Sequence, residues 1–378
     1  MDFGFSEEQE MLRKSARDFL AKECPMSYVR QMMEDEIGYS KEVWRKMAEL
    51  GWMGLIFPES VGGSGLDMVD LVVVLEEMGR VVLPGPYFAT VLLGGVTLAE
   101  VGSEDQKKRY LRPIAEGTLK ATLALVEPNG RWDAGGIELE AKSDAGGFLL
   151  TGTKLFVPDA HTADLILVAA RTDKAKGAEG LSLFAVEVPK HGVTITPLKT
   201  MDQTRKLCEV VLDKVRVGPE ELVGGRGQGW PVLSRVIDRA KVAHCAEMCG
   251  GAEKVLEMSV EYAKVRVQFD RPIGSFQAIQ HKCANMLLQV ESAKSATYYA
   301  AWAVANDVEE APLAAAMAKA YTSDAYRIVA GEGIQIHGGI GFTWEHDMHI
   351  YFKRAKGSEF TFGDATYNRE LVAQLINL

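Results

Sequence analysis

The sequence predicts an α+β protein with several domains: a helical N-terminal domain over residues 1–120, a middle antiparallel β-sandwich or β-barrel over 121–228, and a C-terminal domain like a four-helix bundle over 229–378. Apolar residues follow the helical period in the first third of the chain and again from Gly229 onward. Between these regions, short β-prone segments alternate with turn residues. At 378 residues, the chain is long enough to give these domains a sizeable core.

The N-terminal helices start from a recognisable signal. Ser6 and Gln9 have the spacing of a capping box, and apolar residues at helical spacing follow as far as Leu20. Further helical patterns run to Leu50 and cover residues 68–78, 90–98 and 105–114. Glycine and proline separate them at 62–63 and 84–86.

The middle region changes period near residue 121. Its β-prone segments are 122–126, 147–152, 165–169, 181–186, 193–197 and 209–217. From Gly229 the helical period returns over 230–265, 276–306 and 313–334, with Pro272 and Pro312 in the connections. These three stretches are long enough for a bundle of long helices.

Composition excludes several classes of protein. Hydrophobic residues make up 47% and charged residues 25%, which is typical of a globular protein. The net charge of -10 argues against a nucleic-acid partner or an anionic membrane surface. No apolar run has the length of a membrane span and no secretory leader is recognisable, so we expect a cytoplasmic protein.

Five scattered cysteines predict neither a disulfide framework nor a metal site. Their number is odd. Cys245 and Cys249 lie one helical turn apart beside His244, but no second pair of ligands stands nearby. Cysteine is also a common buried residue, so we predict no metal.

Two motifs carry most of the functional information. The first is Arg266-Val-Gln268-Phe269-Asp270-Arg-Pro272-Ile273, and the second is Gln335-Ile-His-Gly338-Gly339. A guanidinium offers a fork of N–H donors that suits a pyrophosphate. The paired glycines let a ligand approach the backbone where a side chain would block it.

In this order and within this domain plan, the motifs resemble those of the acyl-CoA dehydrogenase family over essentially the whole chain. Further matching pieces are Phe57-Pro-Glu-Ser-Val-Gly62-Gly63, Glu127-Pro128 and Gly152-Thr-Lys154-Leu-Phe156. The resemblance implies removal of an α-proton and a β-hydride from an acyl-CoA thioester. FAD would accept the hydride, and an electron-transfer flavoprotein would reoxidise it.

The resemblance also assigns cofactor residues. Arg266, Gln268 and Phe269 match the family's FAD-diphosphate and adenine contacts from one subunit. Gln335, Gly338 and Gly339 match contacts from a neighbouring subunit, which implies a homo- or hetero-oligomer, a dimer or a tetramer. Phe156 matches the aromatic residue that covers the flavin.

The sequence departs from the family pattern around the flavin ring. Asp270 stands where the family usually has glycine, and Pro158 replaces a hydroxyl residue that often hydrogen-bonds the flavin. Val126 and Trp132 replace the usual threonine and serine. The resemblance therefore implies FAD with a non-standard ring environment.

Neither usual position of the catalytic glutamate holds a carboxylate. Alignment on Gly338-Gly339 brings one position to Phe362, and counting back from Phe269 brings the other to Ala240. Glu247 lies two helical turns after Ala240 among apolar residues, an environment suited to a base. Asp364 is the other candidate; it could also cap the next helix, just as Glu247 could serve a contact between subunits. A chain with no base of its own remains the third alternative.

Two hypotheses of function follow. The first is an FAD-dependent acyl-CoA dehydrogenase for a bulky, branched or cyclic acyl group, because a displaced base suits an α-carbon that cannot reach the usual place. The second is a non-catalytic, FAD-clasping subunit of a heterotetrameric acyl-CoA dehydrogenase. A nicotinamide-dependent oxidoreductase is disfavoured, since no Gly-x-Gly-x-x-Gly links a strand to a helix.

Overall fold

The computed structural model describes residues 4–173 and 177–378. The chain folds as two compact units. One, here called the helical unit, consists of Met1–Gln31, Asp67–Leu83 and Lys241–Leu378. The other, the β unit, consists of Met32–Leu66 and Pro84–Ala240.

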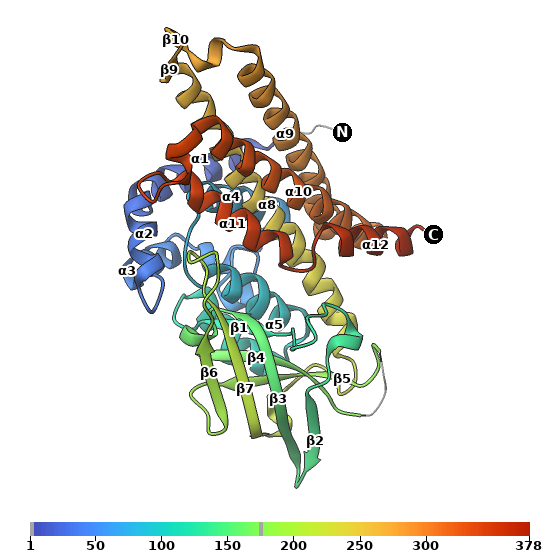
Figure 1. The fold of residues 1–378 in the computed structure, drawn as a ribbon. Helices are drawn as coiled ribbons and strands as arrows, with labels where there is room; N and C mark the ends of the chain where they lie inside the picture. Colours follow the sequence, from blue (N-terminus) through green and yellow to red (C-terminus); the bar gives the residue numbers. More distant parts are fainter. Residues whose placement is uncertain (1–3, 174–176) are drawn as a thin grey trace. The chain divides into compact units, whose positions relative to one another are not determined.

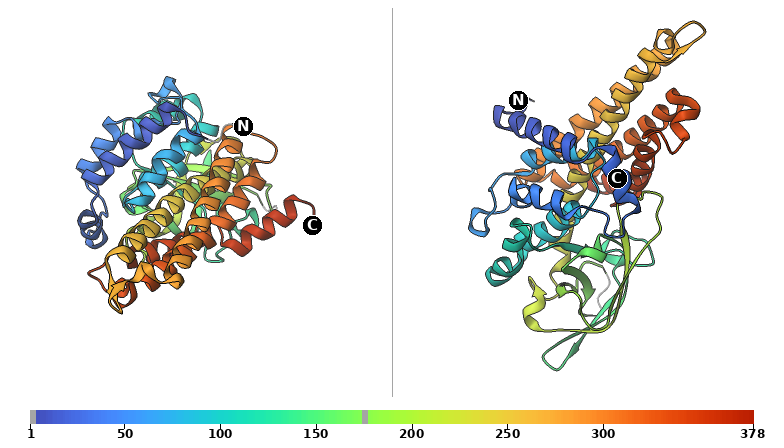
Figure 2. Two further views of the ribbon diagram at one scale, coloured as in Figure 1. Left: turned by 90° about the horizontal axis from the view of Figure 1, so that it is seen from above. Right: turned by 90° about the vertical axis from the view of Figure 1, so that its left-hand side faces the viewer.

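The helical unit is built on long helices that pack side by side (Figures 1 and 2). In the chain they are α1 (Glu7–Glu23), α4 (Met68–Arg80), α8 (Gly229–Val265, from Lys241 onward), α9 (Gln277–Ala305), α10 (Ala311–His337), α11 (Met348–Phe360) and α12 (Ala365–Leu375). A short hairpin of β9 (Val267–Gln268) and β10 (Arg271–Pro272) follows α8. Helix α10 contacts α9, α11 and α12. The predicted capping box is confirmed, since Ser6 and Gln9 exchange hydrogen bonds between side chain and backbone at the start of α1.

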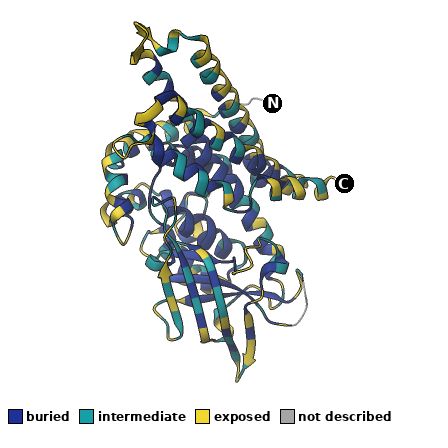
Figure 3. Ribbon diagram, in the orientation of Figure 1, coloured by how far each residue is buried: buried dark blue, intermediate teal, exposed yellow. Residues whose placement is uncertain are grey.

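Helices α4 and α8 approach each other closely enough for their backbones to touch. A Cβ added to Gly79 would lie 1.9 Å from the Glu247 carbonyl oxygen, and one added to Gly250 would lie 1.8 Å from the Glu76 carbonyl oxygen. Two glycines, one on each helix, thus permit this contact. It fixes the segment of α8 that carries Glu247, and residues 240–252 of this helix are all buried. Figure 3 shows the same burial in the middle of the packed helices.

The β unit is centred on one eight-stranded sheet with the strand order β6-β7-β3-β2-β4-β5-β8, to which β1 adds through β4. Its strands are β1 (Ala121–Ala124), β2 (Glu140–Asp144), β3 (Gly147–Pro158), β4 (Leu165–Arg171), β5 (Leu181–Glu187), β6 (Val193–Pro197), β7 (Leu207–Val217) and β8 (Leu222–Val223). Most pairs are antiparallel, as predicted, but β1 and β2 both pair with β4 in parallel. Between β1 and β4 the chain forms the β2–β3 hairpin, and β4 then runs in the same direction as β1.

The β unit also contains helices that precede the first strand in the sequence. They include α3 (Lys41–Glu49), a π-helical turn at Phe88–Gly95, α5 (Val96–Val101) and α7 (Arg112–Ala115). Helix α2 (Met26–Glu34) spans the boundary of the two units in the chain. The helices of residues 1–120 are therefore divided: α1 and α4 belong to the helical unit, and the later ones to the β unit.

The helices carry no membrane signal. Throughout 4–173 and 177–378, no helix is both long enough and apolar enough to cross a membrane.

Candidate functional site

Arg266, Gln268 and Phe269 lie at the exposed C-terminal end of α8 and in the hairpin that follows it. Phe269 and Asp270 form the tip of this hairpin, with φ angles of +54° and +62°. Asp tolerates the left-handed conformation, so Asp270 can stand where the family has glycine. Phe269 is 86% exposed, and its ring meets that of Phe276 edge to face with the centroids 6.0 Å apart.

Gln335, Gly338 and Gly339 lie at the C-terminal end of α10, and all three are exposed. Gly338 ends the helix with a φ angle of +65°. A Cβ added to Gly338 or to Gly339 would meet no atom within 4 Å, so the bare backbone faces open space. This is the property that a ligand-contacting glycine needs.

The two motifs lie at the same end of the helical unit. Tyr262, one turn before Arg266, stacks on His337 with ring centroids 4.4 Å apart. His337 directly precedes Gly338, and its Nδ1 is 2.7 Å from the Gly333 carbonyl oxygen. The end of α8, which leads to Arg266, and the end of α10, which leads to Gly338, are thus neighbours within one chain.

Phe156 lies on β3 of the β unit, where a bulge turns it outward. The register of β3 against β7 shifts between Lys154 and Val157, so one extra residue is accommodated there. Phe156 takes a φ angle of +54° and is 47% exposed. An exposed aromatic ring held in a costly conformation fits a ligand-covering role better than a place in the core.

A buried ion pair fixes the backbone next to Phe156. The Lys154 ammonium, which is fully buried, donates to the Glu127 carboxylate (2.6 Å) and to the Leu125 carbonyl (3.0 Å). Glu127 also accepts the backbone N–H groups of Glu138 and Leu139, each at 2.9 Å. Burial lowers the pKa of Lys154 to about 8, although Glu127 favours its charged form. This pair holds the segment of Val126 beside that of Phe156.

Phe362 and Ala240, which occupy the two usual positions of the base, are both buried. Glu247 is buried too, at 8% exposure. Its carboxylate Oε2 lies 3.3 Å from Nδ1 of His244, and the His244 ring meets the Phe362 ring edge to face at 6.0 Å. The structure therefore brings Glu247 into the neighbourhood of position 362 through His244.

Asp364 caps helix α12. Its carboxylate accepts the backbone N–H of Tyr367 at 2.8 Å, which is the structural role predicted for it as the alternative to catalysis. The loop before it is held by Lys319 of α10, whose buried ammonium contacts the carbonyl oxygens of Ser358, Glu359 and Gly363 at 3.1–3.2 Å. Burial lowers the pKa of Lys319 to about 8.

Sequence reasoning missed the roles of His244, Lys319 and Lys154. The available signal was a charged or polar residue within an apolar stretch, which implies a buried partner.

Cys245 and Cys249 are buried, and burial raises the pKa of Cys245 to about 12. Across the residues described, no group of three or more His, Cys, Asp or Glu side chains is placed to hold a metal ion.

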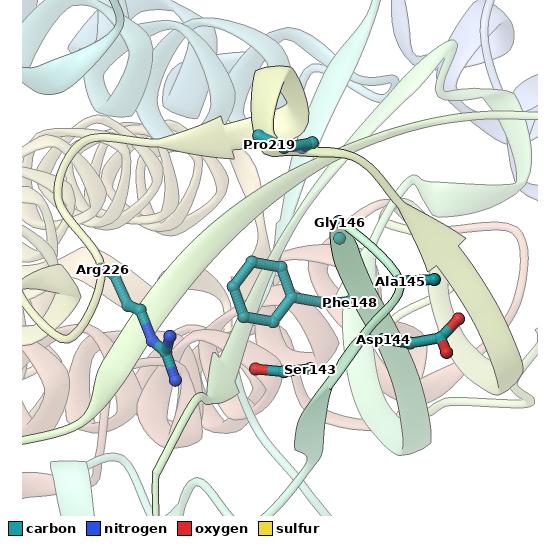
Figure 4. Close-up of a pocket in the computed structure, with 8 residues that line it drawn as sticks. Ser143, Asp144, Ala145, Gly146, Phe148, Pro219 and Arg226 are labelled. Atoms are coloured by element: carbon teal, nitrogen blue, oxygen red, sulfur yellow. The ribbon is translucent and has the colours of Figure 1, made fainter.

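A pocket of about 420 Å³ opens beside the β2–β3 hairpin of the β unit (Figure 4). Phe148 and Arg226 lie on its wall, with the guanidinium 5.5 Å from the ring centroid. None of the residues predicted for the cofactor or for catalysis lines this pocket. It therefore does not contribute to the candidate site.

Each part of the candidate site suits the cofactor that the resemblance implied. The helical unit offers an exposed guanidinium and an open glycine backbone at one end, which match a diphosphate. The β unit offers an outward-turned aromatic ring, which matches a planar ring system. The residues present therefore fit FAD.

Comparisons with known proteins agree over the whole chain. The N-terminal, middle and C-terminal domain models of acyl-CoA dehydrogenases match residues 6–118, 122–215 and 227–376, respectively. A probable acyl-CoA dehydrogenase of Bacillus subtilis (strain 168), YngJ, is 34% identical over 381 residues, and the match covers 99% of each chain.

Three solved structures show the same fold. Butyryl-CoA dehydrogenase from Megasphaera elsdenii aligns with a TM-score of 0.93 at 30% identity and covers 100% of both chains. The ChsE4–ChsE5 complex from Mycobacterium tuberculosis aligns with a TM-score of 0.91 at 30% identity, and the match covers 100% of this chain and 99% of the chain in that complex. The G363A variant of the Tcur3481–Tcur3483 steroid ACAD aligns with a TM-score of 0.88 at 29% identity, and the match covers 98% of both chains. The chain belongs to the acyl-CoA dehydrogenase family of flavoprotein oxidoreductases.

Proposed function

We propose that this protein catalyses the α,β-dehydrogenation of an acyl-CoA thioester whose acyl group is bulky, branched or cyclic, with Glu247 as the base. The observation that carries the proposal is the buried Glu247 carboxylate, which is linked through His244 to Phe362 at the position of the lost glutamate. Phe362 fills with an aromatic ring the place where the family's usual base would stand. A base displaced along α8 suits a substrate whose α-carbon lies farther from that place.

Asp364 is the less suitable base. Its carboxylate already accepts the Tyr367 N–H and ends the loop before α12. One of its two oxygens is thus engaged in the helix cap, which ties the carboxylate to the start of α12. Glu247 makes no such contribution to a helix end, because it lies in the middle of α8.

The cofactor would be held by this chain's exposed groups. Arg266, Gln268 and Phe269 of one subunit would contact the diphosphate and the adenine, and Gln335, Gly338 and Gly339 of a neighbouring subunit would complete the clasp. Phe156 would cover the flavin. When bound, FAD supplies the hydride acceptor. Pro158 has no N–H to donate to the flavin, and its carbonyl oxygen accepts the Thr122 hydroxyl at 2.6 Å.

We also propose an oligomer, as a dimer or a tetramer, that is reoxidised by an electron-transfer flavoprotein. Large apolar side chains on α9 and α10 are 39–65% exposed, and surfaces of this kind are typical of subunit contacts. They are Leu287, Leu288, Met317, Tyr321 and Ile328. One of the similar structures is itself a complex of two named chains.

The test is anaerobic mixing of the FAD-containing protein with a panel of acyl-CoA thioesters while flavin bleaching is recorded. We expect branched or cyclic acyl groups to bleach the flavin faster than butyryl-CoA does. Glu247→Gln should lower the reduction rate by about 10²-fold or more with unchanged FAD content. Asp364→Asn should retain reduction, since Asn preserves the helix cap. Normal reduction by Glu247→Gln would show that the base is elsewhere.

A second function is favoured by one observation: both usual positions of the base, Ala240 and Phe362, lack a carboxylate. In this alternative, the chain completes the FAD clasp for a catalytic sister chain in a heterotetramer. Coexpression with a homologous chain distinguishes the two functions. A homo-oligomer that is reduced by an acyl-CoA on its own excludes the alternative, and absence of bleaching until the sister chain is added supports it.

A further inference from the structure

We propose that His244 is a positioning residue that orients the Glu247 carboxylate for proton abstraction. This inference rests on the proposed function, in which Glu247 is the base. The two side chains form a buried pair that takes over the role of a single glutamate at position 362.

The spacing along α8 places the residues of this pair on one helix face. Ala240, His244 and Glu247 are separated by four and three residues, so their side chains lie one above another. His244 is 1% exposed and Glu247 is 8% exposed. Water therefore has little access to their contact, and an interaction between them is correspondingly stronger.

The chemistry of the pair determines which group donates. An ionised carboxylate can only accept, so Nδ1 of His244 carries the hydrogen that points to Oε2 of Glu247 at 3.3 Å. The same imidazole packs against Phe362, with the ring planes at 82° to each other. Phe362 thus restrains the ring that orients the carboxylate. His244 itself neither gains nor loses a proton in this role.

The backbone beneath the pair is held as firmly as the side chains. Gly79 of α4 lies against the Glu247 carbonyl, and Gly250 lies against the Glu76 carbonyl one turn later. A base must be held close to its reacting position by groups that are themselves fixed. The close helix contact fixes the backbone of Glu247, and His244 fixes its carboxylate.

The experiment compares His244→Leu and His244→Asn in the FAD-containing oligomer, with an acyl-CoA that reduces the wild type. Asn places an N–H donor where Nδ1 of the imidazole was, whereas Leu provides none. We expect Leu to lower the limiting rate of flavin reduction by about 10- to 100-fold, since a misplaced group costs this much. The apparent Kd for the acyl-CoA should stay within about threefold, and Asn should recover most of the rate. His191→Leu, at an exposed site of the β unit, is the matched control.

Two results overturn the inference: a normal rate in His244→Leu, or equal losses in Leu and Asn variants that retain FAD. If His244→Leu does not fold, His244→Gln replaces it, because Gln places its amide at the position of Nε2 instead. Equal rates of flavin reduction for the Asn and Gln variants then overturn the inference.

The Glu247→Gln variant separates the two proposals. If it retains reduction, the proposed function fails; if it loses reduction while His244→Leu is normal, only the role of His244 fails.

Discussion

Asp364 shows how a single side chain can look catalytic in the sequence and be structural in the fold. It is two residues from the position of the lost glutamate, yet its carboxylate accepts the Tyr367 N–H at the start of α12. We expect Asp364→Ala to lower the free energy of unfolding by about 1 kcal/mol, and Asp364→Asn by much less, because only Asn keeps a capping oxygen. Chemical denaturation of the holoprotein measures both. Equal losses in Ala and Asn would contradict the capping role.

Lys154 and Glu127 form a pair whose two halves depend on each other. Lys154→Met would leave the Glu127 carboxylate buried without its cation, which costs about 3–5 kcal/mol. We expect a clear fall in Tm together with weaker retention of FAD, since Phe156 lies two residues away. Adding Glu127→Gln should recover part of the Tm, because the amide oxygen can still accept from the backbone. Lys142→Met, at an exposed position on β2, is the control and should leave Tm nearly unchanged.

Lys319 gives a pH dependence with a definite sign. Burial lowers its pKa from 10.5 to about 8, so between these values the unfolded chain binds more protons than the folded one. The cost of burying its charge is thus present below about pH 8 and disappears as the pH rises toward 10.5. We expect the Tm of the wild type minus that of Lys319→Met to be larger at pH 9.5 than at pH 7.5. Lys264→Met, on the exposed end of α8, should show no such change.

The elements that the sequence predicted well are those whose signal is local. The segments 147–152, 165–169, 181–186, 193–197 and 209–217 all fall within observed strands, because each is a β-branched or apolar run between turns. β2 was missed since Glu140–Asp144 is mostly polar and is defined by its pairing with β3. The parallel pairing of β1 with β4 was also missed, because it joins residues about 40 positions apart and leaves no local trace.

The contact of α4 with α8 yields a prediction at the scale of elements. In Gly79→Ala the added Cβ would lie 1.9 Å from the Glu247 carbonyl oxygen, so the helices must move apart. We expect a loss of about 1–3 kcal/mol in stability and slower flavin reduction, because Glu247 moves with the backbone.

Gly331→Ala is the matched control for this change. It lies within α10, and a Cβ there would meet no atom within 4 Å. Alanine should therefore stabilise the helix by about 0.5–1 kcal/mol. If Gly79→Ala proves as harmless as Gly331→Ala, the close approach of α4 and α8 does not position Glu247.

For the molecule as a whole, the sequence could reveal the family and the identity of the cofactor segments but not their spatial relation. Arg266 and Gly338 are 72 positions apart, and no local pattern states whether one chain or two bring them to a ligand. The Tyr262–His337 stack shows that the end of α8 and the end of α10 are neighbours within one chain. The role of the His244–Glu247 pair could not be predicted either. It depends on the contact of His244 with Phe362, and these two residues are far apart in the sequence.

Mixed oligomers test this relation directly. Arg266→Gln and Gly339→Val should each reduce bound FAD, the first by removing a charged fork and the second by filling the space beside the backbone. If one chain supplies both segments of a site, every site in an oligomer of the two variants carries one defect. If two chains supply them, half of the sites in a mixed dimer combine two intact segments. The resemblance assigns Arg266 and Gly339 of one site to neighbouring subunits, so we expect doubly tagged mixed dimers to recover about half of the wild-type flavin content. Mixed dimers that stay as poor in FAD as either variant alone would instead place Arg266 and Gly339 of each site on one chain.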